Sequence, residues 1–158
     1  MQPPCTPPAV MTEAARRVLL IAEFEARLVH EWKIREFDLL LGLLHENDQT
    51  AALLRSRGAT LEGLRGRDGL AEVTAATEAP LPLPLSSLAR VAFIAAAEEA
   101  GRRGCPLGTP HLLYALLRDD RYLVCRTLVE ACRVDLAELR AAVWDLLAES
   151  ATVPQHHR

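Results

Sequence analysis

The sequence predicts an all-α protein in which two pseudo-symmetric four-helix repeats pack into one compact eight-helix domain. Apolar residues recur at helical spacing along most of the chain, and the same order of helical segments occurs on both sides of a proline-rich stretch. Of the 158 residues, 50% are apolar, which is enough to build a core. Each repeat alone, about 65 residues, would have a thin core, so we expect the two repeats to share one.

The first repeat is predicted at residues 11–66, after a disordered tail at residues 1–10. Its first helix starts after Thr12, whose hydroxyl suits an N-cap because it can accept a hydrogen bond from a free amide of the first turn. The helix has an apolar stripe at spacings of three and four, made of Ala15, Val18, Leu19, Ala22, Ala26 and Val29.

Three shorter helices complete the first repeat. The second helix is expected from about Asp38 to Leu44. The third, at residues 50–57, is closed by Gly58, because glycine takes the left-handed conformation that ends many helices. The fourth is expected within residues 60–66.

A linker is predicted at residues 67–85, where Pro80, Pro82 and Pro84 each push the preceding residue out of the helical region. The second repeat follows at residues 86–149, and a C-terminal tail at residues 150–158. Its helical segments repeat the order of the first four, at residues 89–104, 111–120, 122–133 and 135–150.

The repetition can be followed residue by residue. Glu25 matches Glu99, the run "LLLGLL" from residue 39 matches "LLYALL" from residue 112, and residues 59–65 match residues 134–140. The offsets are 74, 73 and 75. They change only where loops fall, as insertions and deletions in a duplicated helical unit would produce.

The charge and hydropathy patterns exclude several classes of function. The formal net charge is −3, from 18 basic and 21 acidic residues that are mixed along the chain, so no basic face for nucleic acid is expected. No apolar run approaches the roughly 20 residues needed to cross a bilayer, and the first residues lack the pattern of a secretory signal. We therefore expect a cytoplasmic protein that binds neither nucleic acid nor membranes.

The sequence contains no motif for a cofactor or a metal. The single lysine, Lys33, follows no glycine-rich loop, so a P-loop is excluded. Cys125 and Cys132 are seven apart and would share one helix face, but no C-x-x-C pair occurs, and buried reduced thiols are the favoured interpretation. We therefore expect no cofactor and no bound metal.

The two repeats resemble the double-repeat amino-terminal domain of the Clp unfoldases, as in ClpC- and ClpA-type proteins. Residues 12–26 match the family pattern F-T-x-x-A-x-x-V-L-x-x-A-x-x-E-A from its threonine without a gap, and residues 84–100 resemble its second occurrence. Gly108, Thr109 and His111 fit the family's G-T-x-H. The resemblance covers residues 11–149 and none of the ATPase modules of a full unfoldase, so a stand-alone domain is expected.

The resemblance implies a docking platform, because in the family this domain receives substrates, adaptor proteins or, in some members, proteins marked with phosphoarginine. It therefore predicts a non-enzymatic protein-binding module that acts as an adaptor, decoy or regulator of a Clp unfoldase-protease. The predicted partners are a Clp ATPase, its substrates or its adaptors, together with cyclic-peptide antibiotics of the kind that bind related domains.

The chain departs from the family at the tetrapeptide G-T-E-H, which opens the second helix of each repeat. In the phosphoarginine-binding members its glutamate helps to recognise the guanidinium group, but Phe37 and Pro110 stand at these two positions here. We therefore expect weak or no binding of phosphoarginine. Phe37 is either a core residue, which is favoured, or an exposed apolar contact. Glu36 is a candidate replacement for the lost carboxylate, from one position earlier.

The candidate binding residues lie at the starts of the repeats and of their second helices. Thr109 is expected to be an N-cap, with Pro110 at the first helical position. Arg16 and Arg90 either line the binding seam or are simply solvated, and Leu85 and Ser86 contact either the core or a ligand. The complete candidate set is Thr12, Arg16, Glu36, Phe37, Leu85, Ser86, Arg90, Thr109 and His111.

Two other functions stay open at this point. One is a homodimeric structural scaffold, which a mass that rises with concentration would indicate. The other is a small thiol enzyme, for which Cys105, His111 and a carboxylate are the only conceivable catalytic set.

Overall fold

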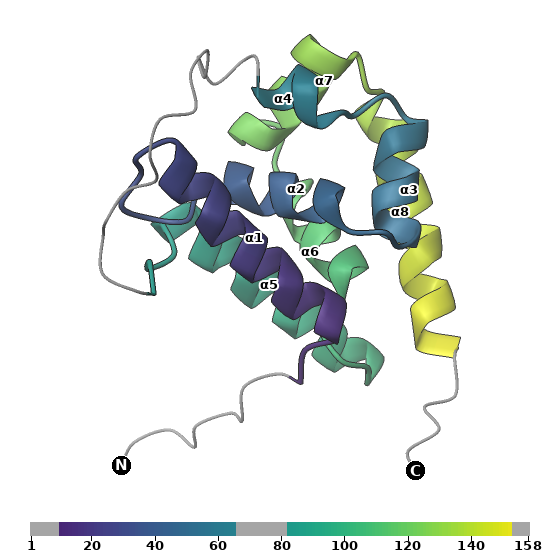
Figure 1. Cartoon of the computed structure of the whole chain (residues 1–158). Coiled ribbons are helices and arrows are strands. Elements are labelled where there is room, and N and C mark those ends of the chain that lie inside the picture. The colour runs from purple at the N-terminus through teal and green to yellow at the C-terminus, as the bar shows by residue number, and fades with distance from the viewer. Residues whose placement is uncertain (1–9, 66–81, 153–158) are drawn as a thin grey trace, which may run out of the picture.

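The computed structural model describes residues 10–65 and 82–152, and in these ranges the chain forms eight α-helices and no β-strand (Figure 1). The predicted all-α fold is therefore confirmed. The predicted tails up to residue 9 and from residue 153, and the linker up to residue 81, lie outside the described residues. The helices are α1 Glu13–Leu28, α2 Glu36–His45, α3 Gln49–Ser56, α4 Leu61–Arg65, α5 Ser87–Arg103, α6 Thr109–Leu116, α7 Leu123–Cys132 and α8 Leu136–Thr152.

At the start of α2 and the end of α6, the predicted helix boundaries were wrong for identifiable reasons. Helix α2 begins two residues before Asp38, because the Asp38 carboxylate accepts a hydrogen bond from the backbone N–H of Arg35 at 2.9 Å and closes the first turn. Helix α6 ends at Leu116, four residues before the end of the predicted segment. There, Asp119 accepts from the backbone N–H of Arg121 at 2.9 Å and forms a turn that competes with the helix.

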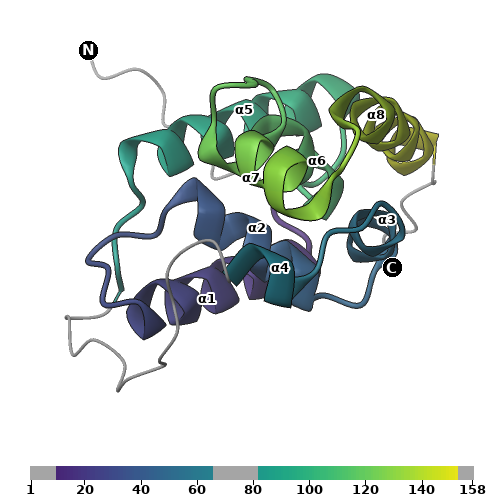
Figure 2. The same ribbon diagram turned by 90° about the horizontal axis from the view of Figure 1, so that it is seen from above.

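The two repeats exchange contacts, so that neither forms a separate bundle. Within each repeat the first helix packs on the second, α1 on α2 and α5 on α6. Helices α2 and α6 also contact each other and lie between α1 and α5 (Figure 2). The remaining helices pair across the repeats, α3 with α8 and α4 with α7. The single shared core that the length of each repeat predicted is therefore present.

The centre of this core consists of α2 and α6, which are apolar around most of their circumference. Such helices are stable only where other helices cover them on several sides. Leu39, Leu40, Leu43 and Leu113 have no solvent exposure, and Leu112 is 1% exposed. The repeated leucine runs of the sequence therefore mark the two central helices of the fold.

Two short backbone pairings join the repeats and define the seams discussed below. The N–H of Thr12 donates to the carbonyl of Leu107 at 2.9 Å, which places the start of α1 beside the start of α6. The N–H of Ser86 donates to the carbonyl of Ile34 at 2.8 Å, which places the start of α5 beside the start of α2. We call these junctions the α1/α6 seam and the α5/α2 seam.

Among the described residues, none of the helices combines the length and the apolar character that crossing a bilayer requires.

Candidate functional site

A hollow of ≈ 370 Å³ lies at the α1/α6 seam. It is bordered by the start of α1, the loop before α6, the first turn of α6 and Ser150 near the end of α8. Thr12, Thr109 and His111, three of the candidate residues, line it together. Thr12 is also the N-cap of α1, as predicted, since its Oγ1 accepts a hydrogen bond from the N–H of Ala15 at 3.1 Å.

His111 organises the first turn of α6. Its Nδ1 accepts a hydrogen bond from the backbone N–H of Gly108 at 2.9 Å, and this leaves the proton of the neutral ring on Nε2. Nε2 lies 3.4 Å from the Sγ of Cys105. Burial lowers the pKa of His111 from its ordinary value, and the positive charge of Arg103 lowers it further. His111 is therefore a neutral, structurally bound imidazole at neutral pH.

The geometry argues against a thiol enzyme built on Cys105. Burial raises the pKa of the Cys105 thiol, so it stays protonated at neutral pH. The Nε2 of His111 already carries a proton and cannot take the thiol proton. The nearby carboxylate of Asp48 binds Thr109 and the backbone of Ala51, not the imidazole. The three groups therefore do not form the relay that a cysteine nucleophile needs.

Thr109 was expected to be the N-cap of α6, and this prediction was wrong. The cap is Gly108, and Thr109 and Pro110 are the first two helical residues. Thr109 is 4% exposed, and its hydroxyl instead donates to the Oδ2 of Asp48 at 2.7 Å. Because that hydroxyl has one proton, its 2.9 Å contact with the Oγ1 of Thr50 is an accepted hydrogen bond. Thr109 thus ties the second repeat to the first.

The α5/α2 seam repeats this arrangement with different side chains. Ser86 is the N-cap of α5, its Oγ accepting from the N–H of Ala89 at 3.1 Å. Leu85 is half-buried against the core beside Ile34. At the start of α2, Asp38 occupies the place that His111 has in α6, since each accepts a hydrogen bond from the N-cap residue. The Arg35 guanidinium also binds the Asp38 carboxylate, at 3.2 Å.

Phe37 and Pro110 are both the second residue of their helices, so the structure places them as equivalents. Phe37 is 2% exposed and belongs to the core, so it is not an exposed apolar contact. The Arg35 guanidinium carbon lies 5.8 Å from the centre of its ring. Neither position carries a carboxylate.

Glu36 is the first residue of α2 and only 8% exposed. Within the described part of the chain, its carboxylate has no hydrogen bond or ion pair. A carboxylate near a helix N-terminus is favoured by the helix dipole even without a direct partner. Glu36 therefore supplies the one acidic group at the start of α2 that is not already bound to Arg35.

Arg16 and Arg90 are equivalent residues, one turn into α1 and α5, and both are exposed. Neither of them lines the hollow. Asp48 and Ser150 line it without being in the predicted set. Asp48 stands directly before an apolar helical segment, which is a readable N-cap signal, whereas nothing local predicts that α8 returns to this seam.

The described residues contain no group of three or more His, Cys, Asp or Glu side chains that could hold a metal ion. Cys125 is buried and Cys132 half-buried, and both are free thiols. Cys125 and Cys132 therefore behave as small apolar residues on α7.

No family model matches the sequence. The chain is 31% identical over 144 residues to the "ATP-dependent Clp protease ATP-binding subunit ClpA homolog" of Guillardia theta. This alignment covers 90% of the chain but only 18% of that much longer relative.

The fold matches two solved structures of amino-terminal domains. One is that of the caseinolytic protease associated chaperone ClpD from Arabidopsis thaliana, with a TM-score of 0.69 and 20% identity over 87% of this chain and 96% of that chain. The other is the Hsp104 N-terminal domain from Candida albicans, with a TM-score of 0.65 and 14% identity over 87% and 91% of the two chains. At these identities the likeness concerns the fold.

Proposed function

Because this chain is homologous to the amino-terminal region of ClpA-type subunits and has the fold of Clp amino-terminal domains, we propose that it is a protein-binding module. In this proposal, proteins or peptides dock at the α1/α6 and α5/α2 seams. The module then acts as an adaptor, decoy or regulator of a Clp unfoldase-protease, and its partners are a Clp ATPase, its substrates or its adaptors. It has no catalytic role of its own and acts in the cytoplasm.

The observation that carries the proposal is the convergence of the candidate residues on two equivalent junctions. Thr12, Thr109 and His111 meet at the α1/α6 seam, and Leu85 and Ser86 meet the start of α2 at the other. Repeated junctions of this kind offer a ligand two similar docking points. The α1/α6 seam has a hollow large enough for a side chain or a short peptide segment.

Exposed apolar side chains beside the α5/α2 seam support a protein or cyclic-peptide ligand. Leu88, Val91 and Ile94 follow one another at intervals of three along α5, and their exposures are 47%, 49% and 50%. An exposed row of large apolar residues is unusual in a monomeric protein and is typical of an interaction surface. The row starts directly after the Ser86 cap.

Phosphoarginine is not the ligand we propose. The family positions that would recognise its guanidinium hold a core phenylalanine and a proline, and Asp38 is already bound to Arg35. Glu36 offers a carboxylate at only one of the two seams. Binding of free phosphoarginine should therefore be weak or absent.

The proposal is tested by affinity capture with three matched baits. The wild-type chain should retain a Clp ATPase or known Clp client proteins, identified by mass spectrometry. Val91→Glu, beside the α5/α2 seam, should lose them, whereas Val129→Glu, at a similarly exposed position on α7, should retain them. Equal capture by both variants would contradict binding at the seam, and recovery of this chain alone would favour the homodimeric scaffold.

A further inference from the structure

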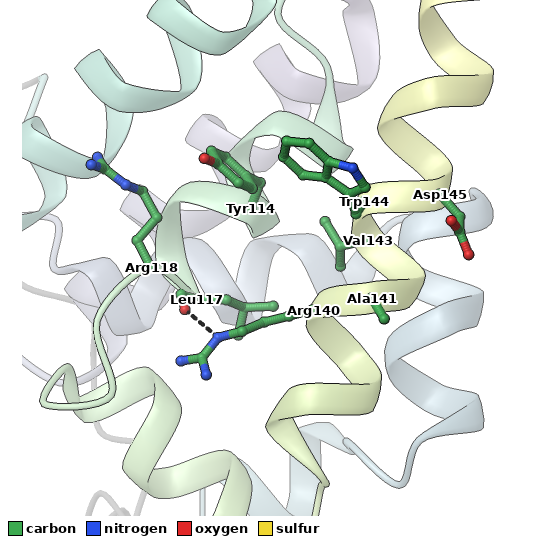
Figure 3. Close-up of a pocket in the computed structure, with 8 residues that line it drawn as sticks. All are labelled: Tyr114, Leu117, Arg118, Arg140, Ala141, Val143, Trp144 and Asp145. Atoms are coloured by element: carbon green, nitrogen blue, oxygen red, sulfur yellow. Dashed lines mark hydrogen bonds between the residues drawn. The ribbon is translucent and has the colours of Figure 1, made fainter.

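A second concave surface lies at the other end of α6, away from the seams. It is a groove of ≈ 570 Å³ between the end of α6 and the first half of α8 (Figure 3). Its volume lies within the usual range of ligand sites. It is lined by Tyr114, Leu117, Arg118, Arg140, Ala141, Val143, Trp144 and Asp145.

The floor of this groove is aromatic and apolar. The rings of Tyr114 and Trp144 lie 5.9 Å apart at an angle of 46°, above the buried side chains of Leu117 and Val143. Trp144 is 52% exposed, and the chain has only one other tryptophan. Half of a large aromatic surface therefore faces water at a place where a partner side chain could cover it.

The rim of the groove has an excess of positive charge. Arg118 is exposed, and its side chain makes no hydrogen bond or ion pair with any described residue. Arg103 lies with its guanidinium carbon 4.8 Å from the Trp144 ring and shares the single carboxylate of Glu99 with Arg102. These charges exceed the acidic groups that face them.

Two other arginines near the groove are already bound to acceptors within the chain. Arg140 is held in place by the carbonyl of Leu117 at 2.8 Å and by an ion pair with Asp120. Asp119 forms an ion pair with Arg121. Among the described residues that line the groove, Asp145 is the one carboxylate, and it lies on the opposite side from Arg118 (Figure 3).

We propose that this groove binds an extended acidic peptide segment of a partner protein. An apolar side chain of the segment packs against the exposed surfaces of Tyr114 and Trp144, and a carboxylate of the segment pairs with Arg118. Tryptophan, tyrosine and arginine are the residue types that contribute most to protein interfaces, and the groove presents all three together. Complementary charge selects an acidic segment over a basic one.

The groove is independent of the seams and goes beyond the proposed function. Leu117, in the groove, is eight residues from Thr109 at the seam, which corresponds to roughly 12 Å along a helix. A ligand at one site does not need to contact the other. Failure of either proposal therefore leaves the other standing.

The fluorescence of Trp144 provides a test of binding in the groove. In a Trp32→Phe background Trp144 is the only tryptophan, so its fluorescence reports on the groove alone. The probes are two octapeptides with acetylated and amidated ends, and each contains two leucines. The other six residues are glutamates in one peptide and lysines in the other. The glutamate peptide should shift the emission of Trp144 to shorter wavelength and should bind at least about tenfold more tightly than the lysine peptide at low salt.

Three substitutions complete the test. Arg118→Gln should weaken binding of the glutamate peptide by about threefold to fivefold. Arg126 is an exposed arginine on α7, and Arg126→Gln should leave the affinity for this peptide unchanged. Trp144→Ala, followed by calorimetry and checked for folding by circular dichroism, should weaken it by about tenfold or more. Equal affinity for the two peptides, or no change in Trp144 emission up to about 1 mM, would overturn the proposal. Emission that depends on protein concentration without peptide would assign the groove to a second copy instead.

Discussion

At the scale of single residues, Gly42 sets how closely the first two helices approach. A Cβ atom at Gly42 would lie 2.6 Å from the carbonyl oxygen of Val18 and 3.1 Å from its Cγ1. The obstacle at 2.6 Å is backbone, which cannot move aside as a flexible side chain would. Gly101, in α5, has nothing within 4 Å of the same position.

We expect opposite effects from alanine at these two glycines. Gly42→Ala should lower the free energy of unfolding by about 1–3 kcal/mol, because overpacking outweighs the better helix propensity of alanine. Gly101→Ala should raise it by up to about 1 kcal/mol, because only the propensity changes. Urea denaturation followed by circular dichroism measures both. A stabilising Gly42→Ala would show that α1 and α2 are not in close contact.

Glu99 gives a prediction that depends on pH. Burial alone would raise its pKa, but hydrogen bonds from Arg103 and Arg102 outweigh burial and hold the pKa below its usual value. A carboxylate with a lowered pKa stabilises the fold above the pKa of the unfolded chain, roughly 4.3, and this contribution is lost as the pH falls through the folded pKa. The stabilisation should therefore be complete at neutral pH.

Glu99→Gln should lower the free energy of unfolding at pH 7 by about 1–2 kcal/mol, and the difference from wild type should shrink below about pH 4. The exposed neighbour Glu98 provides the control, since Glu98→Gln should leave the denaturation midpoint nearly unchanged. Urea titrations at several pH values separate the two. If the loss of unfolding free energy in Glu99→Gln stayed constant down to about pH 3, the charge of Glu99 would not be the cause of the stabilisation.

Some single-residue roles can be read from the sequence and others cannot. The Thr12 cap and the core position of Phe37 follow from local spacing and from the apolar run that surrounds each residue. The role of Thr109 does not, because its partners Asp48 and Thr50 are 61 and 59 residues away in the chain. Helix capping is local, whereas a hydrogen bond between repeats depends on how the repeats dock.

At the scale of elements, the two long first helices begin in the same way. Thr12 caps α1 and Ser86 caps α5, each with a hydroxyl that accepts from the N–H three residues on, at 3.1 Å. Both caps stand directly at a backbone pairing between the repeats. Each cap thus fixes both the start of a helix and one side of a seam.

Thr12→Ala and Ser86→Ala should each lower the free energy of unfolding by a similar amount, about 1 kcal/mol, because the two caps are equivalent. Ser87→Ala is the matched control, as Ser87 is exposed and is the first residue of α5 rather than its cap. It should have little effect. Thermal and urea denaturation provide the measurement, and an equal loss for Ser86→Ala and Ser87→Ala would exclude capping as the cause.

The order of the eight elements follows from the sequence, because apolar spacing and helix-ending glycines are local signals. Gly58, for example, adopts the positive φ of +100° that was expected at the end of α3. The pairing of α3 with α8 and of α4 with α7 has no such signal. Repetition in sequence predicts similar units, and only the packing shows that those units exchange partners.

At the scale of the whole molecule, the two repeats keep the same fold although the residues at equivalent positions differ. Asp38 and His111 perform the same capping role in the two repeats with different chemistry. The tetrapeptides therefore keep a structural function while their third positions, Phe37 and Pro110, differ from the family pattern. The altered ligand preference that we propose follows from this difference.

Wild-type protein should bind free phosphoarginine at least about tenfold more weakly than a Clp domain with both glutamates, since a charge-assisted hydrogen bond contributes roughly 1.5–3 kcal/mol. Phe37 is buried, so a glutamate there would disrupt the core, and Pro110 is the better position to change. Pro110→Glu should gain binding, whereas Pro110→Gln, of the same size but without charge, should not. Calorimetric titration decides, and micromolar binding by wild type would show that Glu36 or another acid has taken over.

The most direct test of docking at the seams is an amide NMR titration of the isotope-labelled chain, with β-casein as an unfolded protein probe. We predict saturable shifts of the amides of Thr12, Ser86 and Gly108, which lie at the two seams, with little change on α7. No saturable shift at up to about 1 mM, or shifts confined to the groove around Trp144, would contradict the assignment of the seams as the protein-binding site.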